Sequence, residues 1–212
     1  MSYRHEPTIS FSSKELFDLA LAWVTLSVAF ALLLHPPAMG PGSPMTFDPG
    51  WFVTLVVLSF LTVGVAFLLH ELAHKVVAIH FGQRAEFRAD YGMLFLAIMS
   101  ALVGFLFAAP GAVYHGARVT VRQNGLIALA GPLTNHALAA LFLPLMLSGG
   151  LVGVVGQMGV WINLFLAAFN MLPFGPLDGR TVWEWHRGVF AVVFVPSVVL
   201  AVYVVVFVGI RI

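Results

Sequence analysis

Two histidines four residues apart enclose a glutamate in an otherwise apolar run. Residues 67–76 read FLLHELAHKV, with His70, Glu71 and His74 in the middle. If this run is helical, the two imidazoles lie one turn apart on the same face, close enough to hold a single ion. Glu71 then points about 100° round the helix, where it can act as a general base on water without being a ligand. This His-Glu-x-x-His spacing is typical of zinc hydrolases.

The alternative is a structural role, with two packed histidines and a glutamate that reaches towards solvent. It would leave three polar side chains in a low-dielectric segment, at a cost of a few kcal/mol each. We therefore favour the metal site. Catalytic zinc needs a third protein ligand, and because the chain has no cysteine, that ligand must offer nitrogen or oxygen.

Asp178 is the strongest candidate for the third ligand. It lies in FNMLPFGPLDG, where Pro173 and Pro176 break the end of an apolar run. Irregular backbone at membrane depth is tolerated where it lines a cavity. Asp178 could instead be a simple turn former before Gly179. The weaker candidates for the third ligand are His80, His115, His136, Glu184 and His186.

The composition indicates an integral membrane protein. Of the 212 residues, 60% are hydrophobic and 9% are charged, whereas soluble domains carry about a quarter charged residues. A spanning helix needs about 20 apolar residues, and the runs that meet this length are residues 16–35, 51–79, 126–147, 151–172 and 189–210. We expect one domain over residues 1–212, an all-α polytopic fold with five to six transmembrane helices and a retained first span. No basic cluster suggests nucleic-acid binding.

The segment between the second and third spans is irregular. Residues 82–92, GQRAEFRADYG, alternate charged and apolar side chains as a short strand does, and PGAVYHGARVTV contains two β-type runs around Gly116. Residues 93–109 are apolar but interrupted by Gly104. Lysines and arginines occur before the first span, between the second and third, and after the fourth, so the positive-inside rule places these parts and the N-terminus in the cytoplasm. A single crossing by residues 93–109 would move two arginines outside, so we predict a re-entrant segment with a small membrane-associated β-hairpin.

The His-Glu-x-x-His pair should lie inside the membrane but near its cytoplasmic border. Trp51 precedes His70 by 19 residues, or roughly 28 Å of helix, against a hydrocarbon core about 30 Å thick. Lys75 then follows close to the border, where it is expected to extend its ammonium group to the interface.

HELAH on the second span and NMLPFGPLDG after a later one resemble the motifs of the site-2 protease family of intramembrane zinc metalloproteases. The second motif matches at Asn170, Pro173, Asp178 and Gly179, and GPLTN at residues 131–135 resembles a further motif of the family. The resemblance covers about residues 51–180. Many relatives also carry a PDZ domain or a CBS pair, for which these 212 residues have no room.

The resemblance implies a role for each matching residue. One zinc ion per chain would be bound by His70, His74 and Asp178, with Glu71 activating water. Asn170 and Asn135 would position the substrate or stabilise the oxyanion. The implied function is an intramembrane zinc metalloprotease of the cell membrane that hydrolyses peptide bonds within or near transmembrane segments of substrate proteins.

A substrate helix must unwind before its peptide groups can be attacked. We predict that Ala112, Val113 and Tyr114 pair with the unwound substrate by β-augmentation. Two other functions are left open: a membrane zinc protease of the prenyl-protein type, with Glu184 as third ligand, and a non-catalytic zinc-binding or transport protein. Self-association into a homo-oligomer is also left open.

Overall fold

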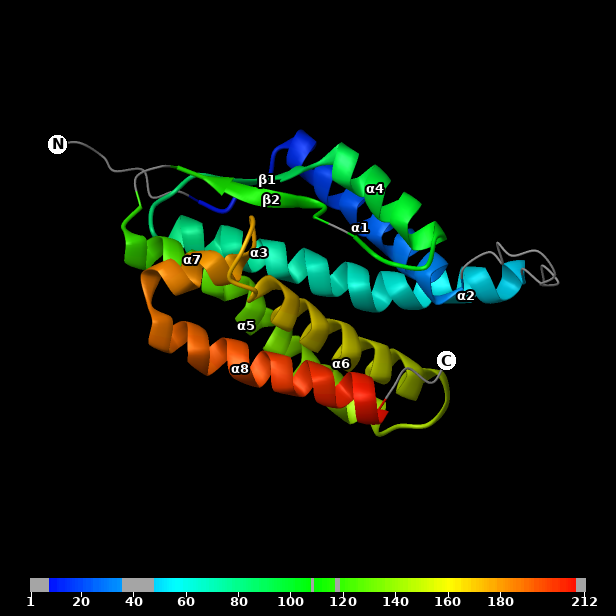
Figure 1. Cartoon of the computed structure of the whole chain (residues 1–212). Coiled ribbons are helices and arrows are strands. Elements are labelled where there is room, and N and C mark those ends of the chain that lie inside the picture. Colours follow the sequence, from blue (N-terminus) through cyan, green and yellow to red (C-terminus); the bar gives the residue numbers. More distant parts are fainter. Residues whose placement is uncertain (1–7, 36–47, 108, 117–118, 209–212) are drawn as a thin grey trace.

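The computed structural model describes residues 8–35, 48–107, 109–116 and 119–208. Helices long and apolar enough to cross a membrane lie side by side along one direction (Figure 1). The five such helices in this part of the chain are Ser13–Leu34, Pro49–His80, Val121–Met146, Gly150–Asn170 and Arg187–Val208. The expected all-α polytopic membrane fold is therefore confirmed.

The second span combines three helical segments: α2 (Pro49–Ser59), a π-helical turn (Phe60–Gly64) and α3 (Val65–His80). A π-turn inside a helix frees backbone groups that need other partners. Here Trp23 of α1 (Ser13–Leu34) donates from Nε1 to Phe60 O at 3.0 Å and stacks on the Phe60 ring. Gly64 allows this approach, because a Cβ there would lie 1.9 Å from the indole.

The other long helices follow the sequence closely. α5 (Val121–Met146) begins with a capping box in which Thr120 and Gln123 exchange hydrogen bonds. A tight turn joins it to α6 (Gly150–Asn170), and the short α7 (Asp178–Trp185) follows the proline-broken segment. The last span is α8 (Arg187–Tyr203) with a π-helical turn (Val204–Val208).

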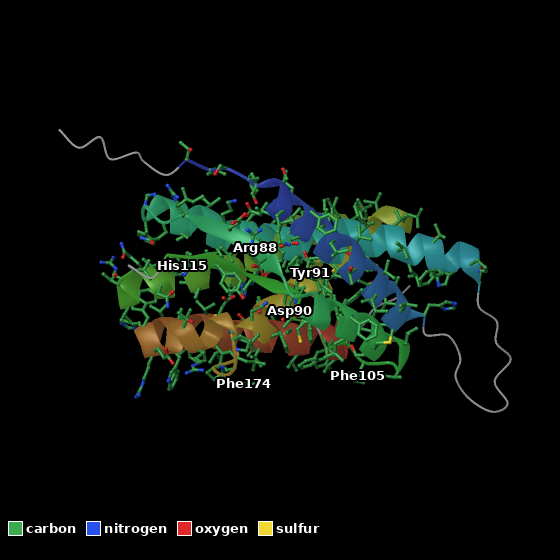
Figure 2. The ribbon with its side chains drawn as sticks, turned by 90° about the horizontal axis from the view of Figure 1, so that it is seen from above. Arg88, Asp90, Tyr91, Phe105, His115 and Phe174 are labelled. Carbon is green, nitrogen blue, oxygen red and sulfur yellow. The ribbon has the colours of Figure 1, made fainter. Side chains whose placement is uncertain are left out.

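The chain between α3 and α5 enters the bundle and returns to the same end. β1 (Ala85–Ala89) leads into α4 (Tyr91–Leu102), which lies along α1, and β2 (Gly111–His115) comes back antiparallel to β1 (Figure 1). Seen from above, Arg88, Asp90 and Tyr91 lie close together where β1 leads into α4 (Figure 2). This path agrees with the predicted re-entrant segment, of which residue 108 lies outside the described residues.

The predicted small β-hairpin is formed by β1 and β2. Of the two β-type runs around Gly116, the first is β2, and α5 already begins at Val121. Glu86 lies opposite Tyr114, and Phe87 lies opposite Val113. The partner strand is 26 residues away, so local alternation could not indicate this pairing.

Lys75 does not extend to the interface, which corrects the sequence-based expectation. Its ammonium lies 2.7 and 2.6 Å from the two carboxylate oxygens of Glu15 and 2.6 Å from Ser10 O, and both side chains are buried. Glu15 Oε1 also accepts from the backbone N–H of Phe87 at 3.0 Å. This one carboxylate therefore joins α1, α3 and β1.

Candidate metal centre

The three predicted ligands lie together. His70 Nε2 is 3.1 Å and His74 Nε2 is 3.4 Å from Asp178 Oδ2. Zinc bonds of about 2.0–2.2 Å in tetrahedral geometry separate two ligand atoms by about 3.3 Å. The nitrogen–oxygen distances therefore suit one zinc ion held by α3 and the first residue of α7. These residues are also the group of candidate metal ligands found in the described part of the chain.

The hydrogen bonds of the two imidazoles leave the correct nitrogen free. His70 Nδ1 lies 2.5 Å from Asn135 Oδ1, and His74 Nδ1 lies 2.7 Å from Ile127 O. Carbonyl oxygens only accept, so each Nδ1 must carry the proton. Each Nε2 then presents a lone pair towards Asp178, as a histidine ligand of zinc requires.

Gly131 makes room for the two imidazoles. A Cβ at this position of α5 would lie 2.4 Å from His70 Nε2, 2.5 Å from His70 Cε1 and 2.5 Å from His74 Nε2. That atom would press on both rings. Glycine at this position therefore lets both imidazoles keep the orientation in which their Nε2 atoms lie beside Asp178 Oδ2.

Asp178 is held in place by the start of α7. Gly179 brings α7 against the end of α6, since a Cβ there would lie 2.1 Å from Met171 O. Within the described residues Asp178 Oδ2 is buried without a hydrogen-bond donor, as a carboxylate that needs a cation would be. Burial raises the pKa of the Asp178 carboxyl, whereas a positive charge beside it lowers that pKa. A divalent cation held by the two neutral imidazoles would supply that charge.

Glu71 and Asn170 open onto the same cavity. The cavity has a volume of about 290 Å³ and is bounded by α1, α3, β2, α5, α6 and the start of α7. Glu71 is itself buried. The remainder of the lining is mainly apolar and includes Phe30, Phe67, Val113, Ile162, Phe165 and Leu166. An apolar hollow beside a buried carboxylate suits a hydrophobic ligand with a polar group.

The weaker third-ligand candidates have other environments. His136 contacts Pro132 O and Ser197 Oγ, Glu184 pairs with Arg180 at 3.0 Å, and His186 Nδ1 accepts from Val189 N as the cap of α8. His115 lines the cavity but does not belong to the ligand cluster. His80, at the end of α3, does not belong to the cluster either.

Asn135 lies behind His70, on the side away from the cavity. Its amide is fully buried and bonds to His70 and to Asn163 of α6, and it does not line the cavity. It therefore contacts a ligand instead of the space for substrate. Sequence analysis assigned no role to Asn163 or Ile127, because nothing local distinguishes them from ordinary helix-packing residues. Gly131 was noticed only as the first residue of the GPLTN motif.

Known proteins of similar sequence are all named "Putative zinc metalloprotease". The chain is 39% identical over 198 residues to MJ0611 of Methanocaldococcus jannaschii, covering 91% of this chain and 95% of that protein. It is 32% identical over 162 residues to YwhC of Bacillus subtilis, covering 66% and 70%. It is 34% identical over 180 residues to Rip3 of Mycobacterium tuberculosis, covering 81% and 42%. No family model and no solved structure matches.

The similarity to the archaeal protein extends over nearly the whole of both chains. It agrees with the His70, His74 and Asp178 cluster and with the long apolar helices. The protein is a membrane zinc metalloprotease, and the chain belongs to the site-2 protease family.

Proposed function

We propose that this metalloprotease cleaves peptide bonds within or near transmembrane segments of other proteins, with Glu71 as the general base. The observation that carries the proposal is the position of the ligand cluster. His70 lies ten residues before the end of the span Pro49–His80, roughly 15 Å along the helix. The adjoining cavity is lined mainly by apolar side chains. A substrate that reaches this site must itself enter the bundle.

The free edge of the sheet offers a place for an unwound substrate. The outer edge of β1 is closed by α1, because Phe87 N donates to Glu15 at 3.0 Å and Ala89 N donates to Asp18 at 3.4 Å. No α1 carboxylate covers β2, and its residues Ala112 and Val113 line the cavity. Strand addition is therefore expected at β2 and not at β1.

The register of the sheet identifies the main-chain groups that would pair. Phe87 and Ala89 direct their N–H groups away from β2, so they form non-hydrogen-bonded pairs with Val113 and Gly111. Val113 and Gly111 must then direct their own N–H and C=O groups away from β1. Outside the β1–β2 ladder, no hydrogen bond among the described residues reaches the main chain of Val113. Val113 is therefore the expected centre of substrate pairing, whereas the main chains of its neighbours Ala112 and Tyr114 face β1.

Glu71 and Asn170 would each have a separate role in the reaction. Zinc, when bound, supplies a Lewis acid that polarises a carbonyl and lowers the pKa of water towards neutrality. Glu71 accepts the proton of the attacking water and returns it to the leaving amine. The side-chain amide of Asn170, which lines the same cavity, would donate to the oxyanion, a contribution worth a few kcal/mol.

The proposed orientation places the N-terminus and the metal centre on the cytoplasmic side of a cell membrane. The end of α3, the start of α5 and α7 lie at one end of the bundle (Figure 1). Arg84, Arg122 and Arg180 belong to this end, whereas the α5–α6 turn at the other end has no lysine or arginine. The positive-inside rule therefore favours this orientation.

A prenyl-protein type of protease would need Glu184 as third ligand. The side chain of Glu184 is 60% exposed and pairs with Arg180, while Asp178 occupies the third position. The contacts of Glu184 therefore argue against this alternative.

The test is a cleavage assay in liposomes with a panel of single-span fusion proteins. Wild type is compared with zinc-loaded Glu71→Gln, and cut sites are mapped by mass spectrometry. We expect cuts inside the spans that disappear in Glu71→Gln, at depths nearer the cytoplasmic end. Cuts confined to soluble tails, or equal cleavage by the variant, would overturn the proposal. A zinc-loaded wild type that cleaves no member of the panel would favour a binding or transport protein.

A further inference from the structure

Two asparagines form a buried polar path that ends at a metal ligand. Asn163 of α6 and Asn135 of α5 are both fully buried between apolar helices. Asn135 Nδ2 donates to Asn163 Oδ1 at 2.9 Å, and Asn135 Oδ1 accepts from His70 Nδ1 at 2.5 Å. Buried amides are costly unless they are bonded, and neither amide lines the cavity.

Asn163 determines the donor–acceptor direction of the hydrogen bonds along this path. Its Nδ2 donates to Gly159 O at 2.8 Å, and a backbone carbonyl can only accept. Asn163 must therefore present its oxygen to Asn135, and Asn135 must present its nitrogen in return. Once the nitrogen of Asn135 faces Asn163, its oxygen is the atom that faces His70.

Without Asn163 this orientation would be weakly held. The remaining acceptor for Asn135 Nδ2 is Ala66 O, at the long distance of 3.4 Å. The oxygen and nitrogen of an amide are nearly the same size, so the group can turn over. A turned amide would present Nδ2 to His70 Nδ1. The imidazole would then carry its proton on Nε2, the atom that must be free to bind the ion.

We infer that Asn163 is a positioning residue of the metal centre, which acts through Asn135 to keep the Nε2 of His70 unprotonated and aimed at zinc. Outer partners of histidine ligands typically alter metal affinity 10–100-fold. Asn163 bonds to Asn135 and not to His70 itself. It therefore affects zinc binding only through the orientation of the Asn135 amide. The inference depends on the zinc site and not on the proposed substrate.

A purely structural role would have a different signature. Polar side chains between spans also hold helices together through hydrogen bonds. Loss of such a contact lowers stability but leaves the metal affinity of the folded protein unchanged. Thr62→Val provides the matched control, because Thr62 is fully buried in the same span as His70 and its hydroxyl donates to Leu58 O of that span at 2.8 Å, away from the metal centre.

The experiment measures zinc affinity by competition with a chromophoric chelator, and the visible spectrum of the cobalt-substituted protein. Asn163→Leu removes the acceptor for Asn135, and we expect it to weaken zinc binding about tenfold or more and to alter the cobalt spectrum. Asn163→Asp keeps an oxygen acceptor for Asn135, so it should bind zinc like the wild type even where its thermal stability is lower. Thr62→Val should also bind zinc normally.

Unchanged zinc affinity in Asn163→Leu would overturn the inference, as would an equal loss in Asn163→Leu and Asn163→Asp. If Asn163→Leu does not fold, Asn163→Ala removes the same acceptor without adding volume and is judged by the same criteria. Zinc titration needs no substrate, so the result does not depend on whether the protease proposal holds.

Discussion

Substitution of Gly131 by alanine tests the metal centre most directly. The added Cβ would lie 2.4 Å from His70 Nε2 and 2.5 Å from His74 Nε2, whereas unbonded heavy atoms approach to about 3.5 Å. Either the imidazoles or α5 must therefore shift by about 1 Å. Zinc needs both nitrogens at about 2.0–2.1 Å, so such a shift would move them out of ligand geometry.

The expected loss exceeds that of an outer-partner mutation. Changes beyond the ligands cost 10–100-fold in affinity, and here two ligands are displaced together, so we expect zinc affinity to fall by at least about 100-fold, or about 2.8 kcal/mol. Gly131 lies inside α5, where alanine is favoured over glycine by about 0.5–1 kcal/mol. A loss of zinc binding could therefore not be attributed to a weaker helix.

The assay is zinc titration against a competing chelator on detergent-purified protein, with helical content and thermal unfolding recorded in parallel. Gly149→Ala is the matched control, because a Cβ at Gly149 meets nothing within 4 Å. It should bind zinc like the wild type. If Gly131→Ala also binds zinc within threefold of the wild type, the nitrogens do not converge on a single ion and the assignment of the centre is wrong.

Further substitutions test the general base, the third ligand, the buried ion pair of Lys75 and the substrate-binding edge of β2 one at a time. Glu71→Gln should retain zinc while cleavage falls at least about 100-fold, and Asp178→Ala should lose both, as should treatment of the wild type with a strong chelator. Lys75→Met would leave a buried carboxylate unpaired and should cost about 3–5 kcal/mol in the free energy of unfolding, measured by denaturant titration, whereas Arg180→Ala breaks an exposed pair and should cost less than about 1 kcal/mol. Val113→Pro removes an N–H that faces away from β1, so hairpin and zinc should persist while cleavage is lost; unimpaired cleavage by this variant would exclude pairing at Val113.

Much of the fold followed from local properties. Spans are defined by about 20 consecutive apolar residues, so the five long helices were predicted within a few residues of their observed ends. His70 and His74 share a helix face because four residues make one turn. Asp178 was predicted as the third ligand because a carboxylate beside a proline-broken helix end in an apolar chain needs a cation.

What local properties could not indicate are pairings between distant segments. The partner of Lys75 is Glu15, 60 residues away, and β2 pairs with β1 instead of with the next run along the chain. A lysine near a helix end and a short β-type run each have several acceptable partners. Only the packing of α1 against α3 and β1 selects among them.

By itself, the sequence determined the class of protein and predicted the candidate zinc ligands and general base, because these depend on composition and on spacing within one helix or one motif. The tertiary structure decided which nitrogen of each imidazole faces the ion, which strand edge stays open, and why Gly131 must lack a side chain. These properties depend on atoms of helices that approach within a few ångströms, and such contacts arise only when the spans are packed.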